Sequence, residues 1–198
     1  AMYLVDKQIA PRVIATELGN GPYQRLYQAV NDSPYADRIE VRQGDGLQPL
    51  KPGEVYNVII AGMGGETIAQ ILSYDWEKAG SFTCFVFQPM SRPGFLRKVL
   101  AHQGWEIRDE RLVWQNRRFF AMIKVVPGNI PYRLTPLETE AGPILLRQDD
   151  PLVQAYRQWL QKKYQRLRKS LLGSKTSPNN ELLAETEEKL RELEVYLR

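Results

Sequence analysis

The stretch YNVIIAGMGGETIAQIL, residues 56–72, decides the fold class. Residues 56–62 are almost wholly apolar, which is typical of a strand that is covered on both faces of a sheet. Three glycines around Met63 then interrupt the apolar run, and apolar residues resume at helical spacing. A tight turn alone would explain one glycine, whereas three favour a ligand that approaches the backbone closely. We therefore expect a strand, a glycine-rich turn with a ligand site, and a helix.

Strand and helix patterns alternate on both sides of this stretch. Strand patterns occupy residues 12–18, 38–43, 56–62 and 82–90, and helix patterns occupy residues 21–34, 66–80 and 92–105. Residues 106–126 contain two alternating strands around the turn QNRR, which predicts a β-hairpin. This order predicts an α/β fold with a doubly wound, mostly parallel, Rossmann-like sheet and an antiparallel end.

The sequence changes character after Val126. We expect a sheet domain at residues 1–128, a proline-rich connector along its surface at 129–150, and a helical hairpin at 151–198. Apolar stripes predict one helix at 151–172 and a second at about 180–198, on either side of the breaker GSKTSPNN. Two helices joined by a polar loop are typical of an antiparallel, coiled-coil-like hairpin.

The first helix of the expected hairpin is basic. It has six Lys or Arg residues and no acid between Leu152 and Leu172, whereas the second helix carries six glutamates. The charges either pair across the hairpin or bind a phosphate backbone, and the sequence leaves both interpretations open. The candidate nucleic-acid contacts are Arg157, Lys162, Lys163, Arg166 and Lys169.

The composition restricts the chemistry. The chain of 198 residues has a net charge of +4 and a pI near 9.1, a weak bias toward polyanionic partners. Cys84 is the only cysteine and lies in an apolar segment, which favours a core position and a reducing compartment such as the cytoplasm. Because His102 is the only histidine, a zinc site or a Cys–His dyad is excluded, and we expect no metal. No apolar run is long enough to cross a membrane.

Four groups of residues stand where the expected strands end: Glu17, residues 44–46, residues 61–65 and residues 88–90. Open α/β sheets bind ligands at these carboxyl ends. In dinucleotide-binding sheets an acid ends the second strand, about twenty residues after a glycine fingerprint. Glu17 fits that acid, or it is a solvated acid that caps the following turn. No fingerprint precedes it in residues 1–16, so we expect the first strand and its glycine-rich turn to lie upstream of residue 1.

Several of these segments together resemble the bacterial tRNA (adenine-22-N1)-methyltransferases, which use S-adenosylmethionine. The segments are ATELGNGPY, RQGDGL, NVIIAGMGGETIAQIL, FQPM and EAGPILL followed by the helical hairpin. They cover nearly the whole chain in the same order. AGMGG before a helix, paired with a strand that ends in QP, is the more specific part, whereas GDGL alone is weak. The acidic-Gly-Ser-Asp-His type of motif that opens the family pattern has no counterpart here, and Met90 stands where the family often has asparagine.

The resemblance implies a role for each matching residue. Glu17 would bind the ribose hydroxyls of the cofactor, and Asp45 would accept a hydrogen bond from its adenine amino group, with Gly46 beside the ring. Ala61 and Gly62 would also contact the cofactor. The wall of the methyl-donor pocket that faces the target base would be Gly62, Met63, Gly64 and Gly65, and the opposite side would be lined by Gln88 and Pro89.

The implied chemistry suits a site with few ionisable groups. Adenine N1 has an in-plane lone pair that attacks the sulfonium methyl in line, so positioning and exclusion of water dominate. Methyltransferases that act on the N6 amino group usually carry Asn/Asp-Pro-Pro-aromatic at this strand end, and the Gly-Met-Gly-Gly sequence argues against that target.

The resemblance implies tRNA as the partner and a cytoplasmic enzyme, which we expect to be a monomer or a weak dimer. Two alternatives stay open at this point. The chain is a methyltransferase of a small molecule or a protein, with the hairpin as a dimer element, or it is a non-catalytic fragment that lacks the first cofactor motif.

Overall fold

The computed structural model describes residues 1–173 and 180–197 and divides into two compact units. The first unit comprises Ala1–Glu54 and Ile71–Ser81, and the second comprises Val55–Gln70 and Phe82–Arg198. Most of the breaker GSKTSPNN falls in residues 174–179, outside the described residues. The expected boundaries at residues 128 and 150 stay a prediction.

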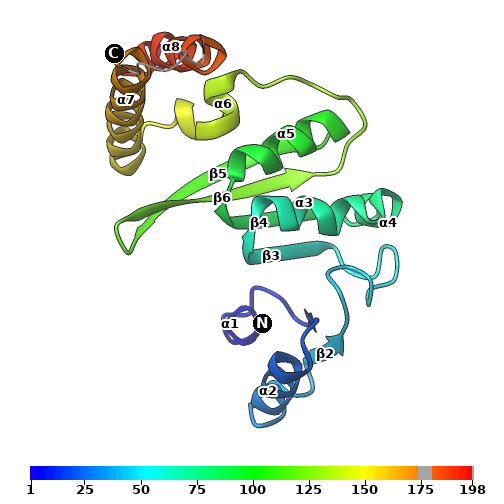
Figure 1. Cartoon of the computed structure of the whole chain (residues 1–198). Coiled ribbons are helices and arrows are strands. Elements are labelled where there is room, and N and C mark those ends of the chain that lie inside the picture. The colour runs from blue at the N-terminus through cyan, green and yellow to red at the C-terminus, as the bar shows by residue number, and fades with distance from the viewer. Residues whose placement is uncertain (174–179, 198) are drawn as a thin grey trace. The chain divides into compact units, whose positions relative to one another are not determined.

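The first unit is built on a two-stranded parallel sheet (Figure 1). Its elements are α1 (Met2–Asp6), β1 (Val13–Glu17), α2 (Asn20–Asn31), β2 (Ile39–Gln43) and α4 (Trp76–Gly80). Val5, Val30 and Ile39 form its small core. Strands β1 and β2 pair from Val13 opposite Ile39 to Glu17 opposite Gln43, so both strands end at the same edge.

The second unit contains a mixed four-stranded sheet with the order β3-β4-β6-β5. Strands β3 (Asn57–Gly64) and β4 (Cys84–Ser91) are parallel, whereas β6 (Arg118–Val126) runs antiparallel to β4 and to β5 (Glu106–Gln115). The α/β class and the antiparallel end are therefore confirmed, but this sheet is mixed rather than mostly parallel. The expected burial of both faces of β3 is wrong, because Val58 and Ile60 are buried while Ile59 is 53% exposed.

The helices that follow β3 and β4 differ in how well the sequence predicted them. The helix expected at 66–80 is two helices, α3 (Gly65–Ser73) and α4, because Asp75 caps a new helix by accepting the Lys78 N–H at 2.9 Å. Helix α5 (Pro93–Gln103) follows the prediction, since it begins at a proline and ends at Gly104 with φ +82°. The main core of the second unit includes Phe85, Phe87, Leu96, Leu100 and Trp105.

The proline-rich segment is more than a connector on the surface. It contains α6 (Pro136–Ala141), which begins with a capping box of Thr135 and Glu138, and the 3₁₀ helix η1 (Leu145–Arg147). The residues of α6 and η1 bury apolar side chains against α7 (Pro151–Leu172) and α8 (Asn180–Val195). This core comprises Leu137, Ala141, Leu146, Leu160, Tyr164 and Leu193. Segment 136–147 thus forms part of the helical layer.

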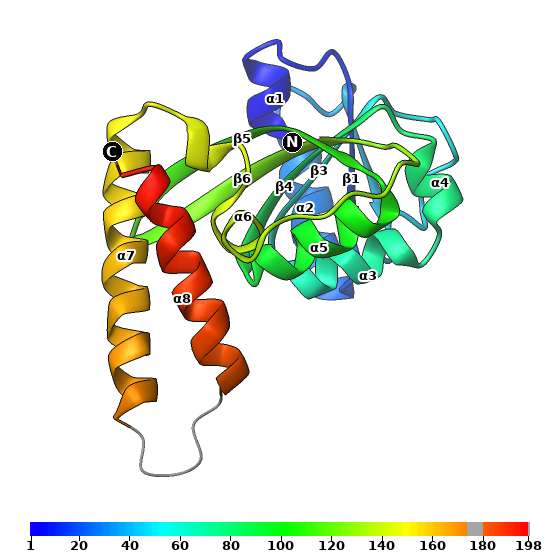
Figure 2. The same ribbon diagram turned by 90° about the horizontal axis from the view of Figure 1, so that it is seen from above.

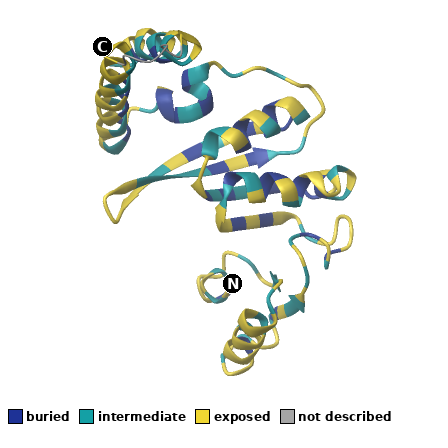
Figure 3. Ribbon diagram, viewed as in Figure 1, coloured by how far each residue is buried: buried dark blue, intermediate teal, exposed yellow. Residues whose placement is uncertain are grey.

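Helices α7 and α8 lie side by side and form the predicted hairpin (Figure 2). Their outward faces are exposed, whereas α6 is buried or half-buried along its length (Figure 3). Among the helices of residues 1–173 and 180–197, none combines the length and the hydrophobicity that a bilayer requires. The same residues contain no cluster of three or more His, Cys, Asp or Glu side chains that could hold a metal ion.

Candidate functional site

In the first unit, the ends of β1 and β2 bring Glu17 next to the Gly44–Gly46 turn. The Gly44 N–H donates to the Glu17 backbone oxygen at 3.0 Å, which ties the two strand ends together. The Glu17 carboxylate accepts the Gly19 N–H through Oε1 at 3.2 Å. Its second oxygen has no hydrogen bond within the described residues, so the side chain can cap the turn and still accept a bond from a ligand.

Asp45 and Gly46 follow at the same sheet edge. The Asp45 carboxylate is exposed, so this edge presents two acceptor side chains, which suit the hydroxyl and amino donors of an adenosine. Gly46 has φ +52°, and a Cβ there would lie 2.6 Å from Ile71 Cγ2. Packing inside this unit therefore requires glycine at position 46 whether or not a ligand is bound.

In the second unit, the expected glycine-rich turn consists of the end of β3, with Gly62 and Gly64, and the start of α3 at Gly65, and it lies against the end of β4. The name glycine turn is kept for residues 62–65. Ala61 is opposite Gln88 and Met63 is opposite Pro89, with an irregular register between them. The Gly62 N–H donates to Gln88 Oε1 at 3.1 Å. The structure thus brings the sequence-predicted glycines together with the Gln-Pro pair.

The three glycines of this turn leave different amounts of space for a side chain. A Cβ on Gly65 would lie 2.4 Å from the Arg92 backbone oxygen, so packing alone excludes any side chain there. A Cβ on Gly64 would lie 3.2 Å from Ser91 Oγ, a side chain that can move. Gly62 has φ +78°, yet no atom lies within 4 Å of its Cβ position. Gly62 is therefore the glycine that leaves open space beside the backbone.

Arg92 is a residue at this edge that the sequence analysis missed. It is the N-cap residue of α5 and has φ +51°. Its guanidinium forms an ion pair with Glu66 in the first turn of α3, and its Cζ atom lies 5.8 Å from the centroid of the Phe95 ring. The sequence feature that could have pointed to Arg92 is its position directly before the proline that opens a helix. The side chain is exposed, so it can reach a phosphate near the glycine turn.

The basic residues predicted on α7 divide into two groups. Arg157 is half-buried and donates through Nη2 to the backbone oxygens of Leu146 and Gln148 at 2.6 and 2.7 Å. It fastens α7 to η1, so its guanidinium is already engaged within the protein. Lys163 pairs with Glu140. The three exposed cations that form no ion pair with any described residue are Lys162, Arg166 and Lys169.

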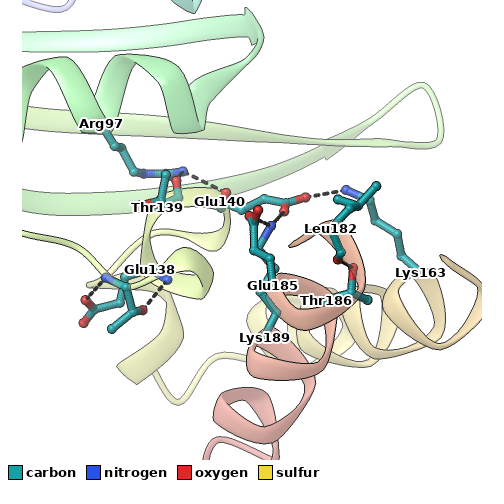
Figure 4. A network of polar contacts seen from close by, with 10 residues as sticks. Arg97, Glu138, Thr139, Glu140, Lys163, Leu182, Glu185, Thr186 and Lys189 are labelled. Carbon is teal, nitrogen blue, oxygen red and sulfur yellow. Dashed lines mark hydrogen bonds and ion pairs between the residues drawn. The ribbon is translucent and has the colours of Figure 1, made fainter. Parts of the chain in front are cut away.

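Charges also pair across the helical layer, so the charge-pairing interpretation of the hairpin holds in part, whereas phosphate binding stays a prediction. Arg168 pairs with Glu187 across α7 and α8 at 2.9 Å. Glu140 of α6 pairs with Lys163 of α7 and, at 3.0 Å, with Lys189 of α8 (Figure 4). Burial alone would raise the pKa of the Glu140 carboxyl, but the two lysines hold it below its ordinary value.

A buried ion pair fixes this helical layer to the sheet. Arg97 of α5 and Glu110 of β5 are at most 1% exposed, and their Nε and Oε1 atoms lie 2.8 Å apart. Arg97 Nη1 also donates to the backbone oxygens of Thr139 and Glu140. The other Glu110 oxygen accepts the backbone N–H groups of Ile144 and Leu145. Segment 139–145, and with it the base of the hairpin, is thereby held to α5 and β5.

Comparison with known proteins identifies the family. The family model of TrmK, tRNA (adenine(22)-N(1))-methyltransferase, matches residues 1–194. The chain belongs to this family. A Bacillus subtilis (strain 168) tRNA (adenine(22)-N(1))-methyltransferase is 29% identical over 140 residues. The match covers 71% of this chain and 59% of that relative, so it spans less than two thirds of the relative's length.

Solved structures of related proteins agree with the fold. A Listeria monocytogenes protein superimposes with a TM-score of 0.86 at 26% identity and covers 99% of this chain and 86% of its own. Streptococcus pneumoniae Sp1610, solved in complex with S-adenosyl-L-methionine, has a TM-score of 0.80 at 26% identity and covers 100% of this chain and 86% of its own. The TrmK family membership confirms the resemblance drawn from the motifs and the Rossmann-like class.

Proposed function

We propose that the protein transfers a methyl group from S-adenosylmethionine to N1 of adenine 22 in tRNA. Membership in the TrmK family over residues 1–194 supports the reaction class, and the cofactor bound to Sp1610 supports the methyl donor. Gly62 carries the assignment of the site, because its backbone is held by Gln88 while the space at its Cβ position stays open. The donor supplies an electrophilic methyl group, so the protein's own residues need only to position the donor and the target base and to exclude water.

In the first unit, the proposed ligand is the adenosine part of the cofactor. The free oxygen of Glu17 would accept hydrogen bonds from ribose hydroxyls, and Asp45 would accept one from the adenine amino group. The Gly46 backbone would lie beside the ring. Two carboxylates at neighbouring strand ends fit these donors, since an ionised carboxylate is an acceptor only.

In the second unit, the glycine turn is the proposed place of methyl transfer. Ala61 and Gly62 would contact the donor, and Met63, Gly64 and Gly65 would wall the space for the base, with Gln88 and Pro89 on the other side. Gln88 acts on this turn through the bond from the Gly62 N–H at 3.1 Å. The methylated base is cationic, so backbone carbonyl dipoles of the turn would stabilise it.

The proposed tRNA contacts on the hairpin are the exposed cations Lys162, Lys163, Arg166 and Lys169, with Lys163 shared with Glu140. Arg157 is left out of this set because it bonds to η1. A tRNA substrate also implies a cytoplasmic protein, which we propose to act as a monomer or a weak dimer.

The site is tested by three alanine variants of the full protein. Gly62→Ala meets no atom within 4 Å, so it costs about 1–2 kcal/mol of stability for a left-handed φ, yet it should abolish methyl transfer to tRNA. Gly53→Ala is the matched control, because Gly53 also has a left-handed φ (+66°) and its nearest atom would lie 3.9 Å from the Cβ, but it lies outside the turn, so its activity should be unchanged. Gly65→Ala should instead lose the fold, since its Cβ would overlap a backbone oxygen.

Activity of each variant is measured as incorporation of a labelled methyl group into tRNA, and circular dichroism verifies that the variant is folded. A folded Gly62→Ala protein with normal turnover would contradict the assignment of the turn.

A further inference from the structure

The second unit contains a cleft of about 1160 Å³ that the proposed methyl-transfer site does not use. It lies between the start of α5, the tip of the β5–β6 hairpin, α7 and α8. Figure 2 shows α7 beside that hairpin. Arg92 lines the cleft and also pairs with Glu66 in the first turn of α3. One end of the cleft therefore borders the loop that packs on the glycine turn.

Four aromatic rings line this cleft and contact one another. The ring centroids of Trp114 and Phe119 are 4.5 Å apart, and the Phe119 centroid lies 5.0 Å from that of Tyr156 and 5.7 Å from that of Trp159. Phe119 and Tyr156 are half-buried and support the cluster, whereas Trp114 is 49% and Trp159 is 45% exposed. Trp159 also stacks on Tyr156 with ring centroids 5.8 Å apart, and Lys163 Nζ lies 5.5 Å from its centroid. Exposed aromatic rings beside unpaired cations are the usual stacking platform for unpaired bases.

The charges that line the cleft divide between its walls. Lys98, Arg117 and Arg118 are exposed at the α5 and β5–β6 side, and none forms an ion pair with any described residue. Glu181 and Glu188 line the α8 side. Lys163 and Lys189 also line the cleft, where Lys163 pairs with Glu140 and Lys189 pairs with Glu140 and Glu185. A phosphate backbone is therefore attracted to the hairpin-tip wall and repelled from α8.

The hairpin tip retains an arginine where glycine would be more stable. Asn116 and Arg117 have φ of +50° and +59°, the conformation of a two-residue hairpin turn that favours glycine at its second position. A side chain in the left-handed region is strained. Arg117 stands at the tip of the hairpin and lines the same cleft as Trp114, so its charge is available to a ligand there.

We propose that unpaired nucleotides of the tRNA occupy this cleft. Their bases stack on Trp114 and Trp159, and their phosphates contact Arg117, Arg118 and Lys98. This inference rests on the proposed tRNA methyltransferase function and assigns the single-stranded part of that substrate to a surface separate from Lys162, Arg166 and Lys169 of α7.

The stacking is tested with Trp114→Leu and Trp114→Phe. Leucine keeps an apolar contact with Phe119 but has no π-face, whereas phenylalanine keeps both. We expect the Kd for tRNA to rise about 5- to 150-fold in Trp114→Leu, the range for one lost stacking contact, and to stay within about threefold in Trp114→Phe. The slope of log Kd against log salt should not change, because no charge is lost. Tyr56→Ala, at an 81% exposed ring outside the cleft, should bind as wild type.

Arg117→Gly separates binding from stability. It should raise Tm by up to about 4 °C by relieving the left-handed strain, while weakening tRNA binding and flattening the salt slope by about 0.7–0.9. If Trp114→Leu is too unstable to measure, tRNA binding by Trp159→Leu and Arg117→Gly still shows whether nucleotides bind in the cleft. If the wild type binds and methylates tRNA, and Arg117→Gly and both leucine variants bind tRNA equally well, the proposal for the cleft is wrong while the proposed function stands. A folded wild type that neither binds nor methylates tRNA would overturn the proposed function as well.

Discussion

Glu110→Gln removes the negative charge that compensates Arg97 in the interior of the second unit. Both side chains are at most 1% exposed, so the guanidinium would stay buried without a counter-charge. Removing one partner of such a pair costs about 3–5 kcal/mol. Because 1 kcal/mol shifts Tm by about 2–4 °C in a protein of this size, we expect Tm to fall by about 6–20 °C.

A second ion pair on the same strand provides the control. Arg108 and Glu106 also approach to 2.8 Å, but both side chains are 55% exposed. Glu106→Gln should therefore leave Tm almost unchanged. The double variant Arg97→Met with Glu110→Leu should also be destabilised, because it leaves the backbone groups of segment 139–145 that bond to this pair without partners.

Thermal and urea unfolding of the four proteins measure these differences, and tRNA binding of Glu110→Gln below its Tm shows whether the hairpin stays attached. Equal losses in Glu110→Gln and Glu106→Gln would refute the view that this pair fixes segment 139–145 to the sheet.

Two further changes test the helical layer. Lys162, Arg166 and Lys169 changed together to glutamine should weaken tRNA binding and flatten its salt slope by about 2–3, while Arg168→Gln, whose charge is already paired with Glu187, should leave the slope nearly unchanged. An unaltered slope in the triple variant would mean that phosphates bind elsewhere. The pKa of Glu140 is depressed in the folded protein, so its contribution to stability is present above about pH 4.5 and is lost as pH falls through the folded pKa. The Tm difference between wild type and Glu140→Gln should therefore be largest near neutral pH and shrink below pH 4.5, and a difference that grew in acid would contradict the pairing with Lys163 and Lys189.

Local signals in the sequence predicted most elements because each signal acts within a few residues. Gly104 ends α5, and Pro151 begins α7 at the expected residue. The turn at residues 115–118 joins the predicted hairpin. The break between α3 and α4 has a local signal too, since Asp75 is a good N-cap, but the apolar spacing continues across it.

Features that depend on distant partners were not predictable from one sequence. The bond of Arg157 to η1 and the burial of Arg97 with Glu110 require knowing which elements pack together. The same limit applies to β3, whose apolar residues suggested two covered faces although Ile59 is exposed. At the candidate site, the spacing of the glycines was visible, but only the backbone showed that Gly65 is required for packing and that Gly62 leaves open space.

The proposed function is tested most directly by locating the methyl group. The full protein is incubated with S-adenosylmethionine and two tRNA transcripts that differ only in carrying adenine or guanine at position 22, and reverse transcription is then used to detect a stop at a base whose Watson–Crick edge is methylated. We predict a stop at position 22 in the adenine transcript and none in the guanine transcript. A stop at another position, or equal methyl incorporation into both transcripts, would contradict methylation of adenine 22 at N1.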